Sequence, residues 1–445
     1  MGVPSIIWDA LRVNSLRENL PQFWGTKGVE MDLIRLPRLA WQGRDSIELP
    51  VPDNWQLEIC NMAGFKEPAL QPFQIRSAIA NPVGSSRIAD LAKGKKEVAI
   101  IFDDMSRGTR TTQIIPFVLE ELASAGIQDS QIRFIAALGC HGVLSRAEFI
   151  KKLGEETLCR FPVYNHNALD SCCTYVGTTS RGTKILVNAE VLKCDFKIGI
   201  GSIVAHFLAG FGGGSKIILP GVTSMSTNEA FHKLFTKLKQ ENPDVYVGIG
   251  VYEKNPLREE IAEATVMVGL DFKIDCLCNA YGETTHVFAG NPGRVFTTGA
   301  DAAKKHYLSP RSRDAGIVIA NICPKVNEPE GGFVQAIPSV SQKGGDMVLI
   351  CNAPDGHVVH YLMGSFGRHT GAVMGTKFKL PAYLNRLIFY NEYPDPTIFD
   401  SFDQPQKVAT ADRWDKVLKL LATDNPAGKK VKVAIYPNAD IQYCK

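Results

Sequence analysis

The chain has 445 residues, which is too long for one ordinary hydrophobic core and predicts two folded units. Apolar residues make up 45% and charged residues 21%, which is typical of globular proteins and excludes disordered, collagen-like and membrane-embedded classes. The net charge is +3, and because neither sign gathers into a long block, a nucleic-acid-binding footprint is excluded too.

The cysteine content favours a reducing compartment. Eleven cysteines occur without a secretory hydrophobic region, which favours reduced thiols. No apolar stretch approaches the length of a membrane span. We therefore expect a cytoplasmic protein that binds neither membrane nor nucleic acid.

The first predicted elements alternate between strand and helix. Residues 1–45 carry several aromatic side chains without a regular period, and we interpret them as an accessory N-terminal segment. The apolar run EVAIIFD (97–103) predicts a buried strand, and apolar residues at helical spacing predict a helix over 112–125. A second strand, IRFIAAL (132–138), and a helix over 146–153 follow.

The alternation continues to the end of the chain. Strands are predicted at KILVN and FKIGIG, an amphipathic helix at NPLREEIAEATVMVGL, and further strands at GIVIAN, DMVLIC, RLIFYN and KVAIYP. This pattern predicts an α/β fold with two mainly parallel, Rossmann-like sheets. We expect a catalytic, cofactor-binding domain at 46–300 and a C-terminal α/β domain at 301–445, with the boundary near 295–310 and the active site at the cleft between them.

Unusual polar residues follow the predicted strands. Asp103 and Asp104 end the first strand, Cys140 and His141 follow the second, and residues 202–216 follow a third. Ligands of open α/β sheets bind beyond the carboxyl ends of the strands. These positions are therefore candidates for a site.

The most informative stretch is GSIVAHFLAGFGGGSKIILPGV (201–222), a glycine-rich loop that begins at His206 and contains Lys216. Glycines let backbone N–H groups approach an anion, but the Walker pattern fails because Ser215 replaces its glycine and Ile217 follows the lysine. A tight turn is the alternative. The apolar run after Lys216 favours a lowered amine pKa and covalent chemistry, whereas an ion pair with a carboxylate is the structural alternative.

Three histidines and one arginine are further candidates. His141, His206 and His232, the last on the predicted helix NEAFHKLFTKLK, supply acid/base groups or a metal ligand. Arg107 suits a bidentate pair with a substrate carboxylate, and an Asp–Arg ion pair that braces the loop is the alternative. The C-x-C at 276–278 is interpreted as core thiols, and HVVH (357–360) is a weaker metal candidate.

From about Ser46 to the C-terminus, four motifs together resemble the nickel-pincer lactate racemase family. They are a D-x-[ST]-R loop (Asp104 to Arg107), ALGCH ending in His141, an H-x-x-A-G-F-x-G-G-x-K-x-I-x-P-G loop (206–221), and a histidine sixteen residues beyond the loop lysine, His232.

The resemblance implies a nickel-pincer nucleotide, pyridinium-3,5-bisthiocarboxylic acid mononucleotide carrying nickel. In such a protein Lys216 holds the cofactor through a thioamide and His232 is the protein's ligand to nickel. The remaining implied cofactor-binding residues are Asp104, Gly212, Gly213 and Gly214. Asp104 either binds the cofactor ribose or steadies Arg107.

The resemblance also implies the catalytic roles. His141 and His206 exchange the substrate hydroxyl proton for the two enantiomers while hydride moves to and from the cofactor, and Arg107 and Gln335 bind the substrate. The implied function is that of a nickel-dependent 2-hydroxy acid racemase or epimerase. A sugar-acid 2-epimerase with the same cofactor and a non-catalytic nucleotide- or metal-binding homologue are the alternatives. Expected partners are a small 2-hydroxy acid and, transiently, cofactor-maturation proteins.

One segment departs from the family pattern. Pro338 stands where lactate racemases have a substrate-binding lysine, and Phe333 and Val334 replace the usual neighbours of Gln335. We therefore expect a substrate other than lactate. Two lysines, 325 and 343, are candidates to replace the missing cation from another direction.

Overall fold

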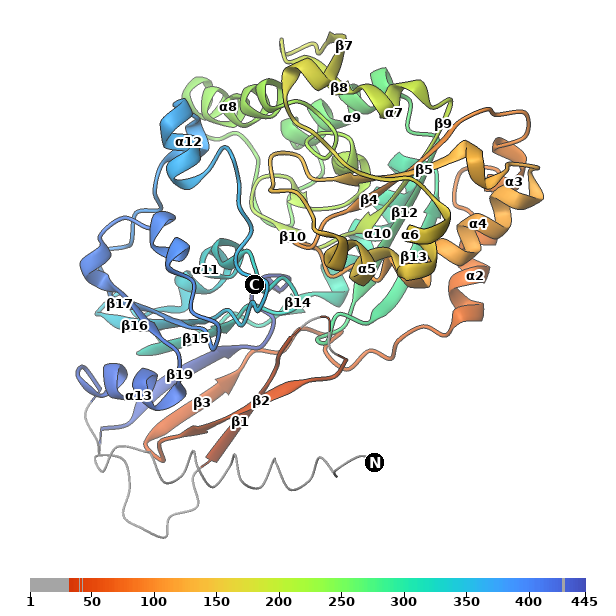
Figure 1. Cartoon of the computed structure of the whole chain (residues 1–445). Coiled ribbons are helices and arrows are strands. Elements are labelled where there is room, and N and C mark those ends of the chain that lie inside the picture. Colours follow the sequence, from red (N-terminus) through yellow and green to blue (C-terminus); the bar gives the residue numbers. More distant parts are fainter. Residues whose placement is uncertain (1–31, 40, 42, 426–428) are drawn as a thin grey trace.

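The computed structural model describes residues 32–39, 41, 43–425 and 429–445. Two six-stranded sheets organise this part of the chain (Figure 1). The first sheet has five parallel strands and one antiparallel edge strand. In spatial order its strands are β13 (Thr284–Gly290), β12 (Phe272–Cys278), β9 (Phe196–Ser202), β4 (Val98–Asp103), β5 (Ile132–Ala137) and β6 (Val163–Asn165).

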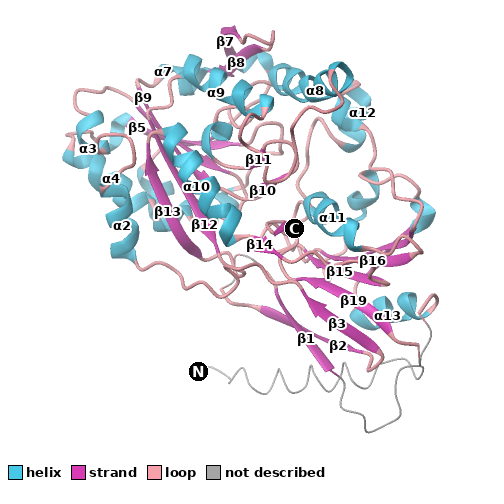
Figure 2. Cartoon of the chain, turned by 180° about the vertical axis from the view of Figure 1, so that it is seen from behind, coloured by secondary structure: helices cyan, strands magenta, loops and turns pink. Residues whose placement is uncertain are grey.

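Helices cover both faces of the first sheet because alternate residues of its strands are apolar on both sides. Ile100 and Phe102 of β4 pack on one face, whereas Ala99 and Ile101 pack on the other. The first face packs against α2 (Pro72–Ala80), α3 (Ile88–Leu91), α4 (Ile115–Ser124) and α5 (Arg146–Leu153). The second face packs against α7 (Ala189–Lys193), α8 (Met225–Glu241) and α9 (Pro256–Val268). Two more helices flank this half: α6 (Glu155–Arg160), labelled in Figure 1, and α10 (Pro292–His306), labelled in Figure 2.

The second sheet is parallel throughout and buried on both faces. Its spatial order is β18 (Val408–Ala411), β17 (Leu384–Tyr390), β16 (Gly345–Ile350), β15 (Ile317–Asn321), β19 (Val431–Tyr436) and β3 (Trp55–Ile59). One face packs against α11 (Pro329–Ala336), and the other against α13 (Trp414–Ala422) and the β1 (Asp32–Pro37)–β2 (Ser46–Val51) hairpin. Helix α12 (Gly364–Thr370) lies in the loop region between β16 and β17.

Short strand pairs complete the fold. They are β7 (Cys173–Thr178) with β8 (Lys184–Asn188), β10 (Ala205–His206) with β11 (Gly210–Phe211), and β14 (Leu308–Ser309) with β20 (Tyr443–Cys444). No helix in the described ranges is both long and apolar enough to cross a bilayer.

The α/β fold with large parallel sheets is confirmed, and the strands and helices predicted from apolar periodicity form where expected. One detail was wrong: the KILVN strand pairs antiparallel with β7 instead of joining the parallel sheet. Most of the predicted accessory segment lies outside the described residues, but residues 32–37 of it pair with β2. The division at residues 46 and 301 stays a prediction, and β3, within 46–300, pairs with β19 of the second sheet.

Candidate active site

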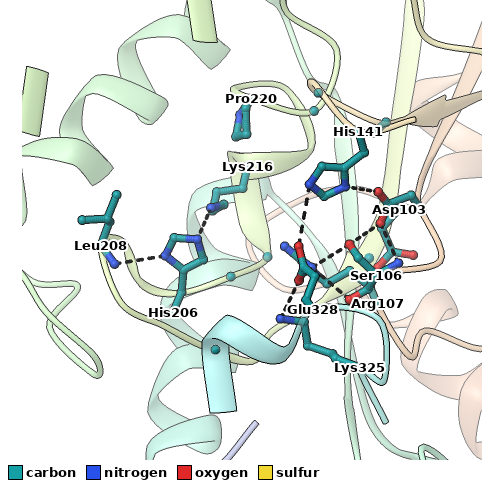
Figure 3. Close-up of a pocket in the computed structure, with 18 of the residues that line it drawn as sticks. Asp103, Ser106, Arg107, His141, His206, Leu208, Lys216, Pro220, Lys325 and Glu328 are labelled. Atoms are coloured by element: carbon teal, nitrogen blue, oxygen red, sulfur yellow. Dashed lines mark hydrogen bonds and ion pairs between the residues drawn. The ribbon is translucent and has the colours of Figure 1, made fainter. Parts of the chain in front are cut away.

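One cavity lies where the carboxyl ends of strands from both sheets meet. The first sheet contributes the loops after β4, β5 and β9, and the second contributes the loops after β15, β16 and β19. Figure 3 labels residues from the loops after β4, β5, β9 and β15. Parallel strands place their following loops at one edge of a sheet, so residues far apart in sequence converge there. All ten predicted site residues line this cavity: Asp104, Arg107, His141, His206, Gly212, Gly213, Gly214, Lys216, His232 and Gln335.

The amine of Lys216 contacts the imidazole of His206 in the glycine loop. Lys216 Nζ lies 2.8 Å from His206 Nε2, and His206 Nδ1 accepts hydrogen bonds from the backbone N–H groups of Leu208 and Ala209. Neutral His206 therefore carries its proton on Nε2 and donates it to Lys216, which requires an uncharged amine. Burial, together with the charges of Arg258 and Arg107, holds the pKa of Lys216 well below its ordinary value.

His206 is neutral for the same reasons. Burial, the largest cause, together with the charges of Arg107 and Arg258, holds the pKa of His206 well below 6.5. The imidazole also stacks on Phe207, with ring centroids 5.1 Å apart. The pair is therefore an imidazole N–H donor facing the lone pair of an uncharged amine, and the uncharged amine is the form of lysine that acts as a nucleophile.

His232 projects from α8 with one ring nitrogen already bonded. Its Nδ1 lies 2.7 Å from the carbonyl oxygen of Asn228, one helical turn earlier, so Nδ1–H donates and Nε2 keeps its lone pair. Burial lowers the pKa of His232 to about 4, although the bond to Asn228 opposes this shift. A neutral imidazole whose second nitrogen is held by a backbone carbonyl is typical of metal-ligating histidines.

Asp104 and His141 form a buried dyad between the β4 and β5 loops. Asp104 Oδ2 accepts a hydrogen bond from His141 Nδ1, and its Oδ1 accepts the backbone N–H of Ser106 at 3.0 Å. Burial favours a raised pKa for Asp104, but the charges of His141 and Arg107 outweigh it and hold the pKa at about 2. Burial lowers the pKa of His141, yet Asp104 outweighs it and the net shift is upward. The pKa values of His206, His232 and His360 are all lowered, so His141 Nε2 is the most basic imidazole nitrogen among the histidines that line the cavity.

Arg107 is paired with a carboxylate from the other sheet. Glu328 Oε2 lies 2.8 Å from Arg107 Nη1 and 2.8 Å from Lys325 Nζ, while Glu328 Oε1 lies 3.7 Å from His141 Nε2. Burial raises the pKa of Glu328, but Lys325, Arg107 and His141 hold it well below its ordinary value. An ionised protein carboxylate therefore lies between two cations of the cavity.

A buried lysine braces the loop that carries Arg107. Lys152 Nζ lies 2.8 Å from Asp103 Oδ1 and donates to the carbonyl oxygen of Arg107, also at 2.8 Å. The Lys152 side chain is fully buried, and Thr109 donates a second hydrogen bond to Asp103. This network fixes the direction in which the loop leaves β4.

The glycine loop is held from behind by a buried arginine. Arg258 of α9 donates to the carbonyl oxygens of Ala209, Gly212 and Gly213, and its guanidinium stacks on the ring of Phe296 at 3.8 Å. At Gly213 φ is +73°, and a Cβ there would approach Ile203 to 2.5 Å. Glycine is therefore required by the packing of the loop as well as by its backbone conformation.

Three lining side chains keep a polar atom without a hydrogen-bond partner: those of Gln335, Ser202 and Asp440, the last at Oδ1. Gln335 is 3% exposed, and its Nε2 donates to the carbonyl oxygen of Gln442 while Oε1 has no partner. Ser202 Oγ, at the end of β9, is buried and also without a partner. Buried polar groups are normally bonded, so these atoms mark places where a ligand group fits.

The described residues contain no group of three or more His, Cys, Asp or Glu side chains able to hold a metal ion. A metal that receives most of its ligands from an organic cofactor needs only one protein ligand, and His232 meets that condition. Cys276 and Cys278 are buried in β12, as interpreted from the sequence. His357 and His360 lie in the loop after β16, and only His360 lines this cavity.

Comparison with known proteins finds similarity to lactate racemases. Residues 42–243 match the model of the lactate racemase N-terminal domain. Two lactate racemases, from Thermoanaerobacterium thermosaccharolyticum and Lactiplantibacillus plantarum, are each 27% identical over 294 and 289 residues. Each match covers 64% of this chain and 66% of the relative. The chain is therefore similar to lactate racemases over most of its first sheet and the cavity loops that follow it.

Solved structures support the fold over most of the chain. The lactate racemase apoprotein from Thermoanaerobacterium thermosaccharolyticum superposes with a TM-score of 0.70 at 22% identity, covering 93% of this chain and 100% of that one. A protein from Thermotoga maritima gives a TM-score of 0.61 at 18% identity, covering 85% and 99%. The sequence matches span about two thirds of the curated relatives, whereas the shared fold includes both sheets.

Several polar residues of the cavity lining were not among the predicted site residues. Glu328, Lys325 and His360 line the cavity from the second sheet. Lys325 had been named only as a possible replacement for the lysine missing at Pro338, and it does reach the cavity, whereas Pro338 and Lys343 are not among the lining residues. The signal for Glu328 was present in the sequence, because it lies in the polar loop directly after the strand GIVIAN.

Proposed function

We propose that this protein racemises or epimerises a 2-hydroxy acid with a nickel-pincer nucleotide as cofactor. The observation that carries the proposal is the convergence of an uncharged Lys216 amine, a neutral His232 with an available Nε2, and the Asp104–His141 dyad on one cavity. The two lactate racemases support the same reaction class.

The residues fit the proposed cofactor. Lys216 would hold it through its amine, His232 Nε2 would ligate nickel, and the unpartnered Ser202 Oγ would bond a polar group of the cofactor. When bound, the cofactor supplies the acceptor for the hydride that leaves the substrate carbon.

The protein residues would handle the proton and the substrate carboxylate. His141 Nε2 would accept the hydroxyl proton, and the carboxylate of Asp104 would stabilise the resulting imidazolium through Nδ1–H. His206 carries its proton on Nε2 and is ready to donate it on the other side of the cavity. Arg107 and the free Oε1 of Gln335 would orient the substrate.

The test begins with the cofactor. The protein is co-expressed with cofactor-maturation proteins, because a host without them yields material whose inactivity decides nothing. We expect the intact mass to exceed the chain mass and K216A to abolish the increment, with nickel measured by atomic spectroscopy. An unmodified, nickel-free preparation under these conditions would contradict the proposal and favour a non-catalytic homologue.

The reaction is tested by loss of optical rotation across a panel of 2-hydroxy acids that includes lactate and sugar acids. H141A and H206A are each expected to lower turnover at least a hundredfold while nickel stays bound. The matched control is H369A, because His369 is exposed on α12 and does not line the cavity. If H141A and H206A turned over substrate like wild type, the assigned roles would be wrong.

A further inference from the structure

We propose that Glu328 is a specificity-determining residue that restricts the cavity to substrates with a single carboxylate. The inference rests on the proposed function, because it concerns the 2-hydroxy acid that Arg107 would bind. It starts from the position of Glu328, whose carboxylate contacts Arg107 and Lys325 at 2.8 Å each (Figure 3).

The cluster of Arg107, Lys325 and Glu328 has one unit of positive charge left. Two cations share one carboxylate, and the side chains of Arg107 and Glu328 are 19% and 20% exposed, open toward the cavity. Lys325 is 7% exposed, and its backbone N–H is held by Asp440 at 2.8 Å, so it has little freedom to leave Glu328. One incoming carboxylate neutralises the cluster.

The other lysines that line the cavity cannot neutralise a second carboxylate. Lys273 Nζ is fully buried and lies 2.6 Å from Asp275 Oδ1. Lys216 is uncharged in the contact with His206 and is the proposed attachment point of the cofactor. Within the described part of the chain, the cavity lining therefore has no unpaired cation near Glu328 that could bind a second carboxylate of the substrate.

Other carboxylates of the cavity lining strengthen the preference for a substrate with a single carboxylate. Asp104, paired with His141, and Asp440, which accepts the backbone N–H of Lys325, face the same cavity as Glu328. A dicarboxylate would bring its second charge next to these groups in a partly buried site, where repulsion is screened far less than in water. Groups that donate hydrogen bonds, such as hydroxyls, meet no such penalty.

The test compares two ligands that differ only in the second carboxylate. Isothermal titration calorimetry near neutral pH measures the binding of 2-hydroxybutanoate and 2-hydroxybutanedioate to the full-length protein. We expect wild type to prefer the monocarboxylate and E328Q to reduce this preference about tenfold or more, because glutamine keeps the shape and removes the charge. Circular dichroism confirms that E328Q is folded.

The matched control is E330Q in the same cavity. Glu330 bonds Ser401 at 2.7 Å rather than Arg107 or Lys325, and its pKa is raised, chiefly by burial. E330Q should therefore leave the preference unchanged. The R107Q variant tests the proposed substrate site separately from the role of Glu328, because loss of the Arg107 charge should abolish binding of the monocarboxylate.

The possible failures are distinct. An unchanged preference in E328Q, with binding that still depends on Arg107, would overturn the role of Glu328 and leave the proposed substrate site intact. Binding that is insensitive to R107Q, or no binding of either acid to any variant, would overturn both the role of Glu328 and the substrate site of the proposed function.

Discussion

Replacing Asp104 by Asn tests the electrostatic account of the cavity most directly. Asn retains an oxygen that accepts the backbone N–H of Ser106, but it removes the charge that faces His141 and Arg107. The substitution therefore isolates the contribution of one carboxylate charge to stability and to the basicity of His141.

The magnitude follows from the pKa of Asp104. Its value of about 2 lies well below the ordinary 3.8, and at about 1.4 kcal/mol per unit the ionised form gains about 2 kcal/mol on folding. Because the folded-state pKa is depressed, this stabilisation is present above the ordinary pKa and is lost as pH falls toward 2. D104N should lower the free energy of unfolding by about 2 kcal/mol at pH 7, and about half of the difference should be gone near pH 3.

Urea unfolding at several pH values measures this difference. Titration of the His141 ring signals by NMR gives the second readout, and the pKa of His141 should fall in D104N because Asp104 raises it in the wild type. With loaded enzyme, kcat/KM should fall about a hundredfold or more, since His141 loses both its orientation and its counter-charge. A stability difference that stays constant down to pH 3, or an unchanged pKa of His141, would refute the reasoning.

Three other substitutions test further parts of the site. K152M should destabilise the protein by about 3–5 kcal/mol in urea unfolding, because it leaves buried Asp103 without a cation, and adding D103N should recover much of the loss. H232A should reduce nickel in holo-protein, measured by atomic spectroscopy, without lowering the melting temperature by more than a few degrees; full nickel retention would contradict its role as a ligand. R258M should raise the pKa of Lys216, because the charge of Arg258 lowers it in the wild type. Acylation of Lys216 at pH 7, measured by peptide mass spectrometry, should therefore become slower. An unchanged acylation rate would show that burial alone keeps the amine neutral.

Local sequence patterns predicted most of the site residues that the first sheet contributes. EVAIIFD and IRFIAAL are continuous apolar runs, so they could be recognised as buried strands, and parallel strands necessarily present their carboxyl ends at one edge. Asp104 and His141 were therefore expected near each other from chain order alone. Their direct hydrogen bond agrees with that expectation.

Contacts between distant segments were not predictable in the same way. Glu328 lies 221 residues after Arg107, and no local period reports which strand-end loop will face which. Lys152 sits on a helix that was predicted correctly, yet its position over Asp103 depends on how α5 packs on the sheet. Strand β3 joins the second sheet although it precedes every strand of the first, because pairing with β19 depends on the path of the whole chain.

For this protein, composition and periodicity were enough to specify an α/β fold, the order of its elements and the polar residues at the strand ends, because these depend on neighbours a few residues apart. The electrostatic balance of the site was decided by the tertiary structure. The charge of Arg258 lowers the pKa of Lys216, and Glu328 is ionised between Lys325 and Arg107, which lies 221 residues earlier. By contrast, the proton on His206 Nε2 follows from neighbours in the same loop, because the N–H groups of Leu208 and Ala209 occupy Nδ1.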